Sequence, residues 1–89
     1  MLSIRLNITD IKFNKSQETV NLKINNNINI TIVYNYDFDI YKLIFNDVNI
    51  RNYLKELFSI NQLKIYHKDK LLDKDEIRNL FLQYYREHS

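Results

Sequence analysis

Apolar and polar residues alternate along much of the first half of the chain. Residues 2–8 (LSIRLNI), 20–24 (VNLKI) and 28–36 (INITIVYNY) each place apolar side chains at every second position. This period of two predicts three strands that each bury one face. Between residues 9 and 13 the alternation shifts by one position, at Thr9-Asp10. The shift predicts a bulge or a break in the first strand.

Polar stretches separate these strands at residues 14–17 (NKSQ) and 25–27 (NNN). The chain contains no glycine and no proline, so every turn must be made by residues that carry an ordinary side chain. Asparagine tolerates positive φ better than most such residues. We therefore predict a tight hairpin turn at Asn25–Asn27.

Residues 37–45 (DFDIYKLIF) carry two patterns at once. Ile40, Leu43 and Ile44 have helical spacing, whereas Tyr41, Leu43 and Phe45 alternate. We expect a turn at residues 37–39, followed by either a short strand or an early helical turn.

Helical spacing becomes clear after residue 46. The apolar stripe consists of Ile50, Tyr53, Leu54, Leu57 and Phe58. Its i, i+3, i+4, i+7, i+8 spacing predicts an amphipathic helix. Asn46 is the expected N-cap, because Phe45 and Ile50 then have the spacing of a hydrophobic staple.

A short strand at residues 63–66 and a final helix complete the pattern. Asp73 and Glu76 have the spacing of a capping box, and Leu72 with Ile77 repeats the staple spacing. The expected buried stripe of this helix consists of Ile77, Leu80, Phe81, Tyr84 and Tyr85.

These elements predict one α+β domain over residues 1–89. We expect an antiparallel or mixed sheet of about four strands packed against two helices. The order is three strands, an optional fourth strand, a helix, a strand and a helix. The chain has no cysteine and is 45% hydrophobic, so its core must form by packing alone.

Residues 47–77 (DVNIRNYLKELFSINQLKIYHKDKLLDKDEI) resemble the middle of ubiquitin-like β-grasp domains. The helix motif of that family matches Val48, Ile50, Leu54 and Leu57, the strand motif matches Leu63 and Ile65, and the following turn matches Lys70, Leu72 and residues 73–75. The resemblance implies a β-grasp-like fold, in which the N-terminal strand supplies the central strand. It also implies that the outer face of the 63–66 strand binds partners. Asp69 stands where the family has glycine, and the chain lacks a C-terminal Gly-Gly for conjugation.

Composition excludes most familiar chemistry. Without glycine the chain cannot form a P-loop or a dinucleotide-binding turn. With no cysteine and only two histidines, His67 and His88, it lacks the ligands for a zinc site. No serine belongs to a motif that would activate it. We expect no catalytic, cofactor-binding or metal-binding residues, and no enzymatic activity.

Surface binding is therefore the expected activity. The polar side of the 63–66 strand and its turn carries Lys64, Tyr66, Lys68 and Lys70. The last helix adds an expected basic ridge of Lys74, Arg78 and Arg86, and Leu82 lies off its buried stripe. The candidate partner-binding residues are thus Lys64, Tyr66, Lys68, Lys70, Arg78, Leu82 and Arg86. Tyrosine is abundant, with seven residues, and suits interfaces because its ring buries area while its hydroxyl meets a polar partner.

We expect a protein–protein interaction module, with a homodimer as one form of partner. It would present a rigid face or add an exposed strand edge to a partner sheet. The excess of Ile, Asn, Lys, Tyr and Phe, all specified by A/T-rich codons, suggests a small inhibitor or adaptor from a phage, virus or mobile element.

The alternative is a nucleic-acid binder in which sheet tyrosines stack on bases and Lys or Arg side chains meet phosphates. No long apolar run or signal segment is present, so we expect no membrane partner and a cytoplasmic protein, in the host cytoplasm if viral.

Overall fold

The computed structural model describes residues 4–60 and 62–88. These residues form one six-stranded sheet and two helices. Their bounds are β1 Ile4–Asn14, β2 Thr19–Ile24, β3 Ile28–Asn35, β4 Ile40–Phe45, α1 Arg51–Ser59, β5 Leu63–His67, β6 Lys70–Leu72 and α2 Lys74–His88. The α+β class is confirmed, with six strands rather than about four.

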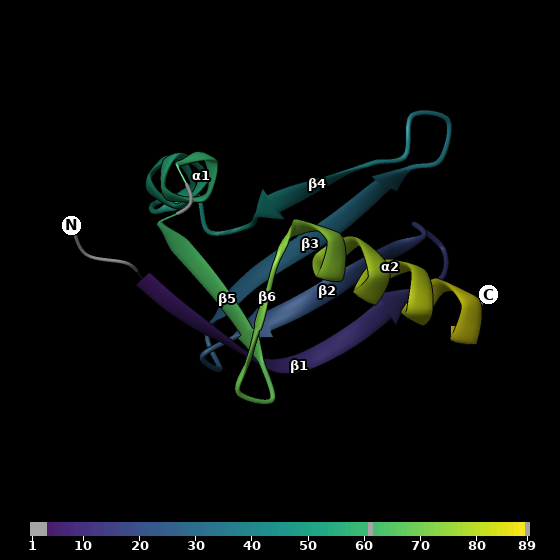
Figure 1. Cartoon of the computed structure of the whole chain (residues 1–89), viewed down its shortest axis with the longest axis horizontal. Coiled ribbons are helices and arrows are strands. Elements are labelled where there is room, and N and C mark those ends of the chain that lie inside the picture. Colours follow the sequence, from purple (N-terminus) through teal and green to yellow (C-terminus); the bar gives the residue numbers. More distant parts are fainter. Residues whose placement is uncertain (1–3, 61, 89) are drawn as a thin grey trace.

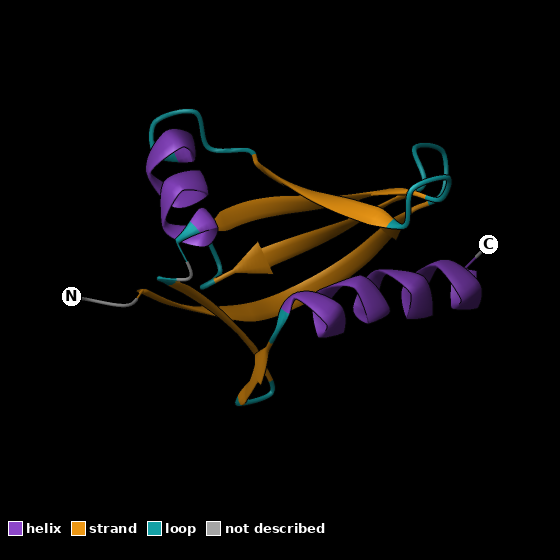
Figure 2. Cartoon of the chain, turned by 45° about the horizontal axis from the view of Figure 1, so that its top comes forward, coloured by secondary structure: helices purple, strands orange, loops and turns teal. Residues whose placement is uncertain are grey.

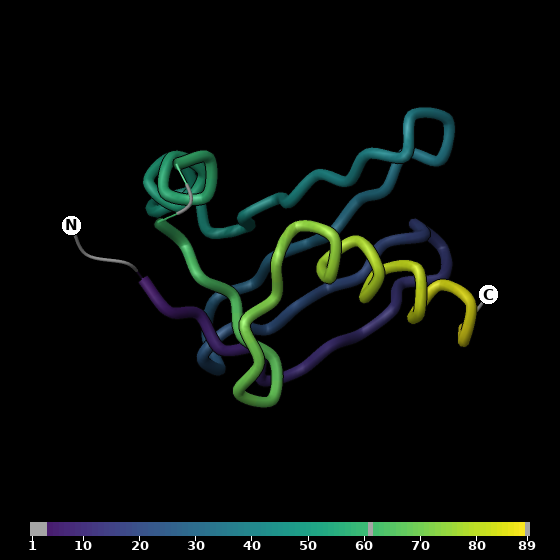
Figure 3. Tube along the Cα trace, viewed as in Figure 1, coloured from purple at the N-terminus to yellow at the C-terminus, as the bar shows by residue number. Residues whose placement is uncertain are grey.

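The strands lie in the order β4-β3-β2-β1-β5-β6 (Figure 1). β1 to β4 form an antiparallel meander, which can be followed along the tube in Figure 3. After α1 the chain returns to the far side of β1, where β5 pairs with β1 in parallel. Figure 2 shows that the resulting sheet is curled rather than flat. β1 therefore lies inside the sheet, between β2 and β5.

The shift in alternation at Thr9-Asp10 is a bulge rather than a break. β1 continues to Asn14, and its register with β2 slips between Ile8 and Asp10. The extra residue keeps Ile8 and Ile11 on one face of the sheet. The Thr9 hydroxyl donates to the carbonyl of Lys23 (3.1 Å) and accepts from the backbone N–H of Asn26 (3.1 Å), so the bulge is tied to the next turn.

Asparagine makes the tight turn without glycine, as predicted. Asn25 and Asn26 have φ angles of 50° and 64°. The side-chain oxygen of Asn25 accepts from the backbone N–H of Asn7 (3.1 Å), and the N–H of Asn25 donates to the carbonyl of Asn7 (2.9 Å). These bonds use the polar side chain to offset the cost of the left-handed backbone. Asp69, at the family's glycine position, also has positive φ (63°).

Residues 37–45 resolve to a turn followed by a strand. β4 pairs with β3 from Ile40 to Phe45, so the strand alternative was right and the helical one wrong. The sequence did not predict β6, whose three residues pair with β5 across the turn at Lys68-Asp69. A strand this short carries too few residues to display a period. Tyr36, expected at the end of the third strand, lies in the following turn.

The predicted start of the first helix was wrong. α1 begins at Arg51, and its N-cap position is Ile50, which makes no side-chain capping bond. Asn46 instead continues the strand pairing, because its backbone N–H donates to the carbonyl of Asn29 (3.0 Å). Val48, matched to the family's helix, lies in a turn and is 71% exposed. Tyr53 is also exposed, whereas Leu54 is buried as expected.

The capping box of the last helix is confirmed. The Asp73 carboxylate accepts from the N–H of Glu76 (2.7 Å), and the Glu76 carboxylate accepts from the N–H of Asp73 (3.3 Å). Of the predicted stripe, Ile77 and Phe81 are buried, and the other three residues pack partly against the core.

The hydrophobic core lies on one face of the sheet. The register places the apolar residues of β1 to β5 on this face, and Leu54 of α1 with Ile77 and Phe81 of α2 join the same cluster. Both helices therefore cover one face, and the opposite face of the sheet is left to solvent. We call this opposite side the open face.

Candidate functional site

β4 forms one edge of the sheet, and its outward backbone groups can be assigned from the register. The N–H of Asn46 donates to the carbonyl of Asn29, so these residues form a hydrogen-bonded pair. Such pairs alternate with non-bonded pairs along an antiparallel ladder. The Ile30/Phe45, Ile32/Leu43 and Tyr34/Tyr41 pairs are therefore non-bonded. The N–H and C=O groups of Tyr41, Leu43 and Phe45 consequently point away from β3.

This edge has few of the features that normally discourage strand pairing. Natural edges are blunted by short length, proline, bulges or several charges. β4 is six residues long, pairs with β3 in unbroken register, and carries one charged residue, Lys42. Phe38 and Ile40, at the start of the strand, are 72% and 60% exposed. β4 is therefore an open edge at Tyr41 and Leu43, with apolar side chains beside it, whereas the Phe45 carbonyl already accepts from the Arg51 guanidinium (3.0 Å).

A groove runs beside this edge on the helix-covered face. We call it the β4 groove. It has a volume of about 420 Å³ and is lined by residues 39–43, Phe45, Lys55, Phe58, Lys74, Asp75 and Arg78. Tyr41, Leu43 and Phe45 thus contribute both the outward backbone and part of the groove wall. This volume lies in the range of ordinary ligand pockets.

The charges of the β4 groove are unevenly paired. Arg78 lies 3.5 Å from Asp39 and 3.4 Å from Asp75, so two carboxylates more than balance its single positive charge. Lys42, Lys55 and Lys74 form no ion pair with the described residues. The groove therefore offers three lysines to an incoming carboxylate.

Tyr41 places an unpaired hydroxyl at the groove. Its oxygen is buried and has no hydrogen-bond partner in the described part of the chain. Burial first, and then the charge of Asp75, raise the pKa of the phenol. The group therefore stays neutral at physiological pH and can donate to a ligand. A buried polar atom without a partner is uncommon in folded proteins and favours a site that a second molecule completes.

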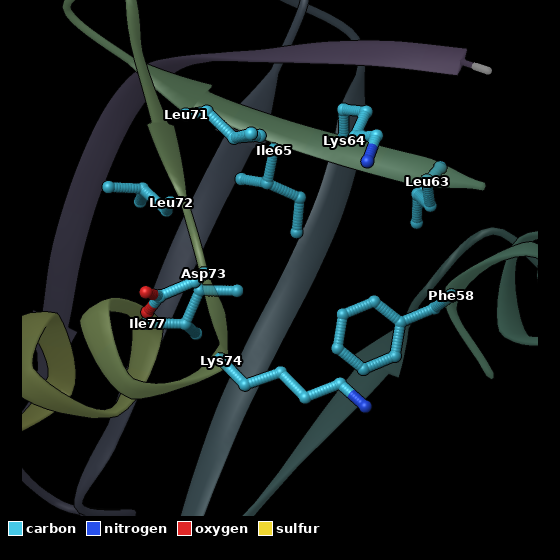
Figure 4. A pocket seen from close by; sticks show the side chains of 9 residues that line it. All are labelled: Phe58, Leu63, Lys64, Ile65, Leu71, Leu72, Asp73, Lys74 and Ile77. Carbon is cyan, nitrogen blue, oxygen red and sulfur yellow. The ribbon is translucent and has the colours of Figure 1, made fainter. Parts of the chain in front are cut away.

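A second pocket adjoins the first. We call it the β6 pocket (Figure 4); it holds about 320 Å³ and is lined by Phe58, Leu63, Lys64, Ile65, Leu71, Leu72, Asp73, Lys74 and Ile77. Phe58 and Lys74 line both pockets. The Lys74 ammonium lies 5.8 Å from the centre of the Phe58 ring, so this pair stands where the pockets meet.

The predicted strand residues do not share one face. Lys64 and Tyr66 lie opposite Arg5 and Asn7 in the parallel register, which puts them on the open face. The Arg5 guanidinium lies 3.9 Å from the centre of the Tyr66 ring. Lys68 occupies the turn between β5 and β6. Lys70 pairs with His67 on the other side of the sheet, and its ammonium forms an ion pair with Glu76.

The predicted helix residues also divide. Arg78 lines the β4 groove. Leu82 packs partly against the core, and Arg86 is exposed. Leu82 and Arg86 line a shallow hollow of about 300 Å³ on α2 that also includes Asn79, Gln83 and Glu87. No single surface unites the seven predicted residues.

The sheet tyrosines are not arranged for base stacking. Tyr34 and Tyr41 form a cross-strand pair on the helix-covered face, where Tyr34 stacks on Phe81. Tyr36 packs against Tyr34 and Tyr85, and burial raises its pKa to about 12. Of the two β5 candidates on the open face, only Tyr66 is aromatic.

Sequence reasoning missed most of the groove. Lys55 attracted no functional interpretation, and Lys74 was interpreted only as part of a basic ridge on the last helix. Tyr41 and Phe58 were interpreted only as a sheet residue and a core residue. The alternation of Tyr41, Leu43 and Phe45 was visible, but the edge position of that strand was not. An edge is defined by the strand order, which the sequence pattern does not contain.

Three further findings concern metal binding, membrane spanning and similarity to known proteins. Among the described residues, no three His, Asp or Glu side chains gather as a metal site would require. Within the same residues, neither helix is long and apolar enough to cross a bilayer. Comparison of the chain with protein-family models, curated proteins and solved structures finds no match.

Proposed function

We propose that the chain is a protein-interaction module that binds an extended segment of a partner by strand addition to β4. The observation that carries the proposal is the coincidence of an open edge with the β4 groove. Tyr41 and Leu43 turn their backbone groups outward while their side chains line the groove. An added strand would gain main-chain hydrogen bonds, and its alternate side chains would supply specificity.

The groove defines the chemistry of the segment. Residues opposite Tyr41 and Leu43 share their face, so their side chains enter the groove. Its lining is aromatic and aliphatic near the strand, which favours a large apolar residue at alternate positions. Lys55 and Lys74 at the rim favour a flanking Asp or Glu. The preferred ligand is therefore an extended peptide with alternating apolar residues and an acidic flank.

The ubiquitin-like resemblance is compatible with this activity. The central position of β1 and its parallel pairing with β5 support a β-grasp-like assignment, which is part of the proposal. An inhibitor or adaptor is the role that suits a small binding module. A second copy of the chain, joined through β4, is the rival occupant of the same edge.

Selection from a random linear peptide library displayed on phage tests the proposal. We expect enriched peptides to follow the alternating pattern with an acidic flank. Synthetic copies should shift the ¹⁵N amide signals of Tyr41, Leu43 and Phe45 in the labelled protein. An absence of enriched peptides, or shifts confined to other surfaces, would contradict the proposal. Sedimentation equilibrium tests whether a second copy of the chain occupies the edge instead. A stable dimer whose interface includes β4 would make that second copy the natural occupant in place of a peptide.

A matched pair of variants isolates the main-chain contribution. Tyr41→Pro removes an outward N–H that the β3 ladder does not use, and Tyr41→Ala removes the same ring while keeping that N–H. Loss of a buried hydrogen bond at an interface costs about 1–2 kcal/mol. We expect Tyr41→Pro to bind the peptide roughly tenfold more weakly than Tyr41→Ala. Equal affinities would exclude strand addition even if the peptide binds in the groove.

A further inference from the structure

We propose that the open face of the sheet binds the phosphate backbone of nucleic acids. Apart from Lys42, which lies on the edge strand and also lines the β4 groove, this surface lies on the opposite side of the sheet from that groove, and the inference does not depend on peptide binding. It also differs from the residues that the sequence suggested, because most of its cations lie on strands β1, β2 and β4.

The charges of the strands are sorted by face. The strands carry seven charged residues: Arg5, Asp10, Lys12, Lys23, Lys42, Lys64 and Lys70. The register places all of them except Lys70 on the open face. Five cations thus share this face with one strand carboxylate. The whole chain has a net charge of only +2, so the remaining surface is net negative.

The local ion pairs reduce this charge without cancelling it. Asp10 lies 3.8 Å from Lys12, and Asp69 of the neighbouring turn lies 3.4 Å from Arg5. Within the described residues, Lys23, Lys42 and Lys64 form no ion pair. Lys12, Lys23 and Lys42 are exposed, so their ammonium groups are accessible.

The cations are spread over several strands of the open face and do not converge on one position. Lys12, Lys23 and Lys42 lie on β1, β2 and β4, and adjacent strands are about 4.8 Å apart. Arg5 and Lys64 continue the charge on the β1–β5 side. A surface of this kind complements a linear polyanion better than a small anion, which would meet one cation at a time.

The side chains between the cations favour nucleic acid over a membrane. The Thr31 hydroxyl donates to the Asn21 side chain (2.7 Å) and accepts from the Asn46 amide (3.0 Å), which holds a polar ladder across β2, β3 and β4. Asn7 and Asn29 extend this polar surface. Amide and hydroxyl groups beside Lys and Arg are the usual contacts to phosphate and sugar. Val33 on β3, Ile40 on β4 and Leu71 on β6 are exposed on this face as well, but Leu71 lies at the opposite edge of the sheet from Ile40. They therefore form no single apolar patch of the kind that a membrane-binding face would combine with its cations.

Fluorescence anisotropy with labelled nucleic acids tests the inference. The probes are a 20-nucleotide single-stranded DNA, the same sequence as duplex DNA, and a duplex RNA, each titrated at several salt concentrations between 50 and 200 mM. We expect binding that weakens with salt. The relative affinities identify which backbone the face prefers.

Two triple variants with the same change in net charge separate the face from the overall charge. Lys12→Gln/Lys23→Gln/Lys42→Gln removes open-face cations, and Lys15→Gln/Lys68→Gln/Arg86→Gln removes cations from turns and α2. On single-stranded DNA the first variant should reduce the slope of log K against log salt by about 2, since each contact contributes about 0.7. The second should leave the slope near that of the natural chain. Circular dichroism verifies that both variants fold.

Three outcomes would overturn the inference. One is an absence of binding to every probe at 50 mM salt. Another is equal loss of affinity in the two variants, which would reduce the effect to net charge. The third is that phosphatidylserine vesicles bind the natural chain as tightly as the nucleic acids do and lose binding in the open-face variant, which would assign the face to membranes.

Discussion

The ring of Tyr34 stacks on the ring of Phe81, with centroids 5.4 Å apart and an interplanar angle of 20°. Tyr34 belongs to β3 and Phe81 to α2, so this contact joins the sheet to the last helix. The Tyr34 hydroxyl donates to Asp39, which also lies 3.5 Å from Arg78 of α2. The turn before β4 is thereby connected to the same helix, and one wall of the β4 groove is held in place.

Truncation of Phe81 should strongly destabilise the fold. Its side chain is fully buried, and removing a buried phenylalanine ring costs about 3–5 kcal/mol. We expect Phe81→Ala to lower the free energy of unfolding by this amount, measured by urea titration followed by circular dichroism. Phe81→Leu should cost clearly less, because it leaves a smaller cavity. Equal costs would mean that ring stacking, not volume, dominates this position.

The capping box should contribute measurably to stability. The Asp73 carboxylate accepts from the N–H of Glu76, and loss of an N-cap side chain costs about 0.5–2 kcal/mol. Asp73→Ala should lower the free energy of unfolding within that range, whereas Asp73→Ser should retain most of it. Urea titration of both variants measures the difference. A stable Asp73→Ala protein with unchanged unfolding would show that the cap is dispensable.

Lys70 should control the titration of Glu76. The hydrogen bond from Lys70, followed by the backbone N–H of Asp73, lowers the pKa of the Glu76 carboxyl. A folded-state pKa below the unfolded one stabilises the protein above the unfolded pKa, and this contribution is lost as the pH falls through the folded pKa. Lys70→Gln should raise the pKa of Glu76, measured by ¹³C carboxyl NMR. Lys68→Gln is the control, and it should leave that pKa unchanged.

The stability of variants in the Asn25–Asn27 turn should depend on how well the new residue tolerates a positive φ. Asn26 has a φ of 64°, where a residue with a Cβ other than Asn or Asp pays roughly 1–2 kcal/mol. Asn26→Ala should therefore destabilise the protein, and Asn26→Gly should leave its stability equal or higher. Thermal unfolding by calorimetry ranks the variants. Asn27→Ala, at a position without positive φ, should be nearly neutral; a large loss there would indicate that side-chain contacts govern the turn.

Local signals were read correctly from the sequence where one short segment contains all the interacting groups. The capping box depends on residues three positions apart, and the turn at Asn25-Asn26 depends on the φ preference of asparagine. The α+β class followed from two hydrophobic periods in different parts of the chain: a period of two in the first half and helical spacing after residue 46.

Predictions failed where distant segments compete for the same residue. Asn46 has the composition of an N-cap, but pairing with Asn29 on β3 takes its backbone N–H. Lys64 and Lys70 lie in one short stretch, yet the β5–β6 hairpin turns them to opposite sides of the sheet. The β4 groove was invisible for the same reason, since it is assembled from β4, α1 and α2. Strand pairing decides all three cases, and the periodicity of a single segment does not contain it.

The parallel pairing of β1 with β5 has a consequence for the order in which the protein forms during translation. Residues 4–7 cannot find their partners at 63–66 until most of the chain has left the ribosome. Contacts between such distant segments form late, because closing a long loop carries an entropic cost before any contact rewards it. Until then, β1 is an unpaired edge of the nascent β1–β4 meander. Such an edge is prone to aggregation during translation, and the arrival of β5 removes this hazard.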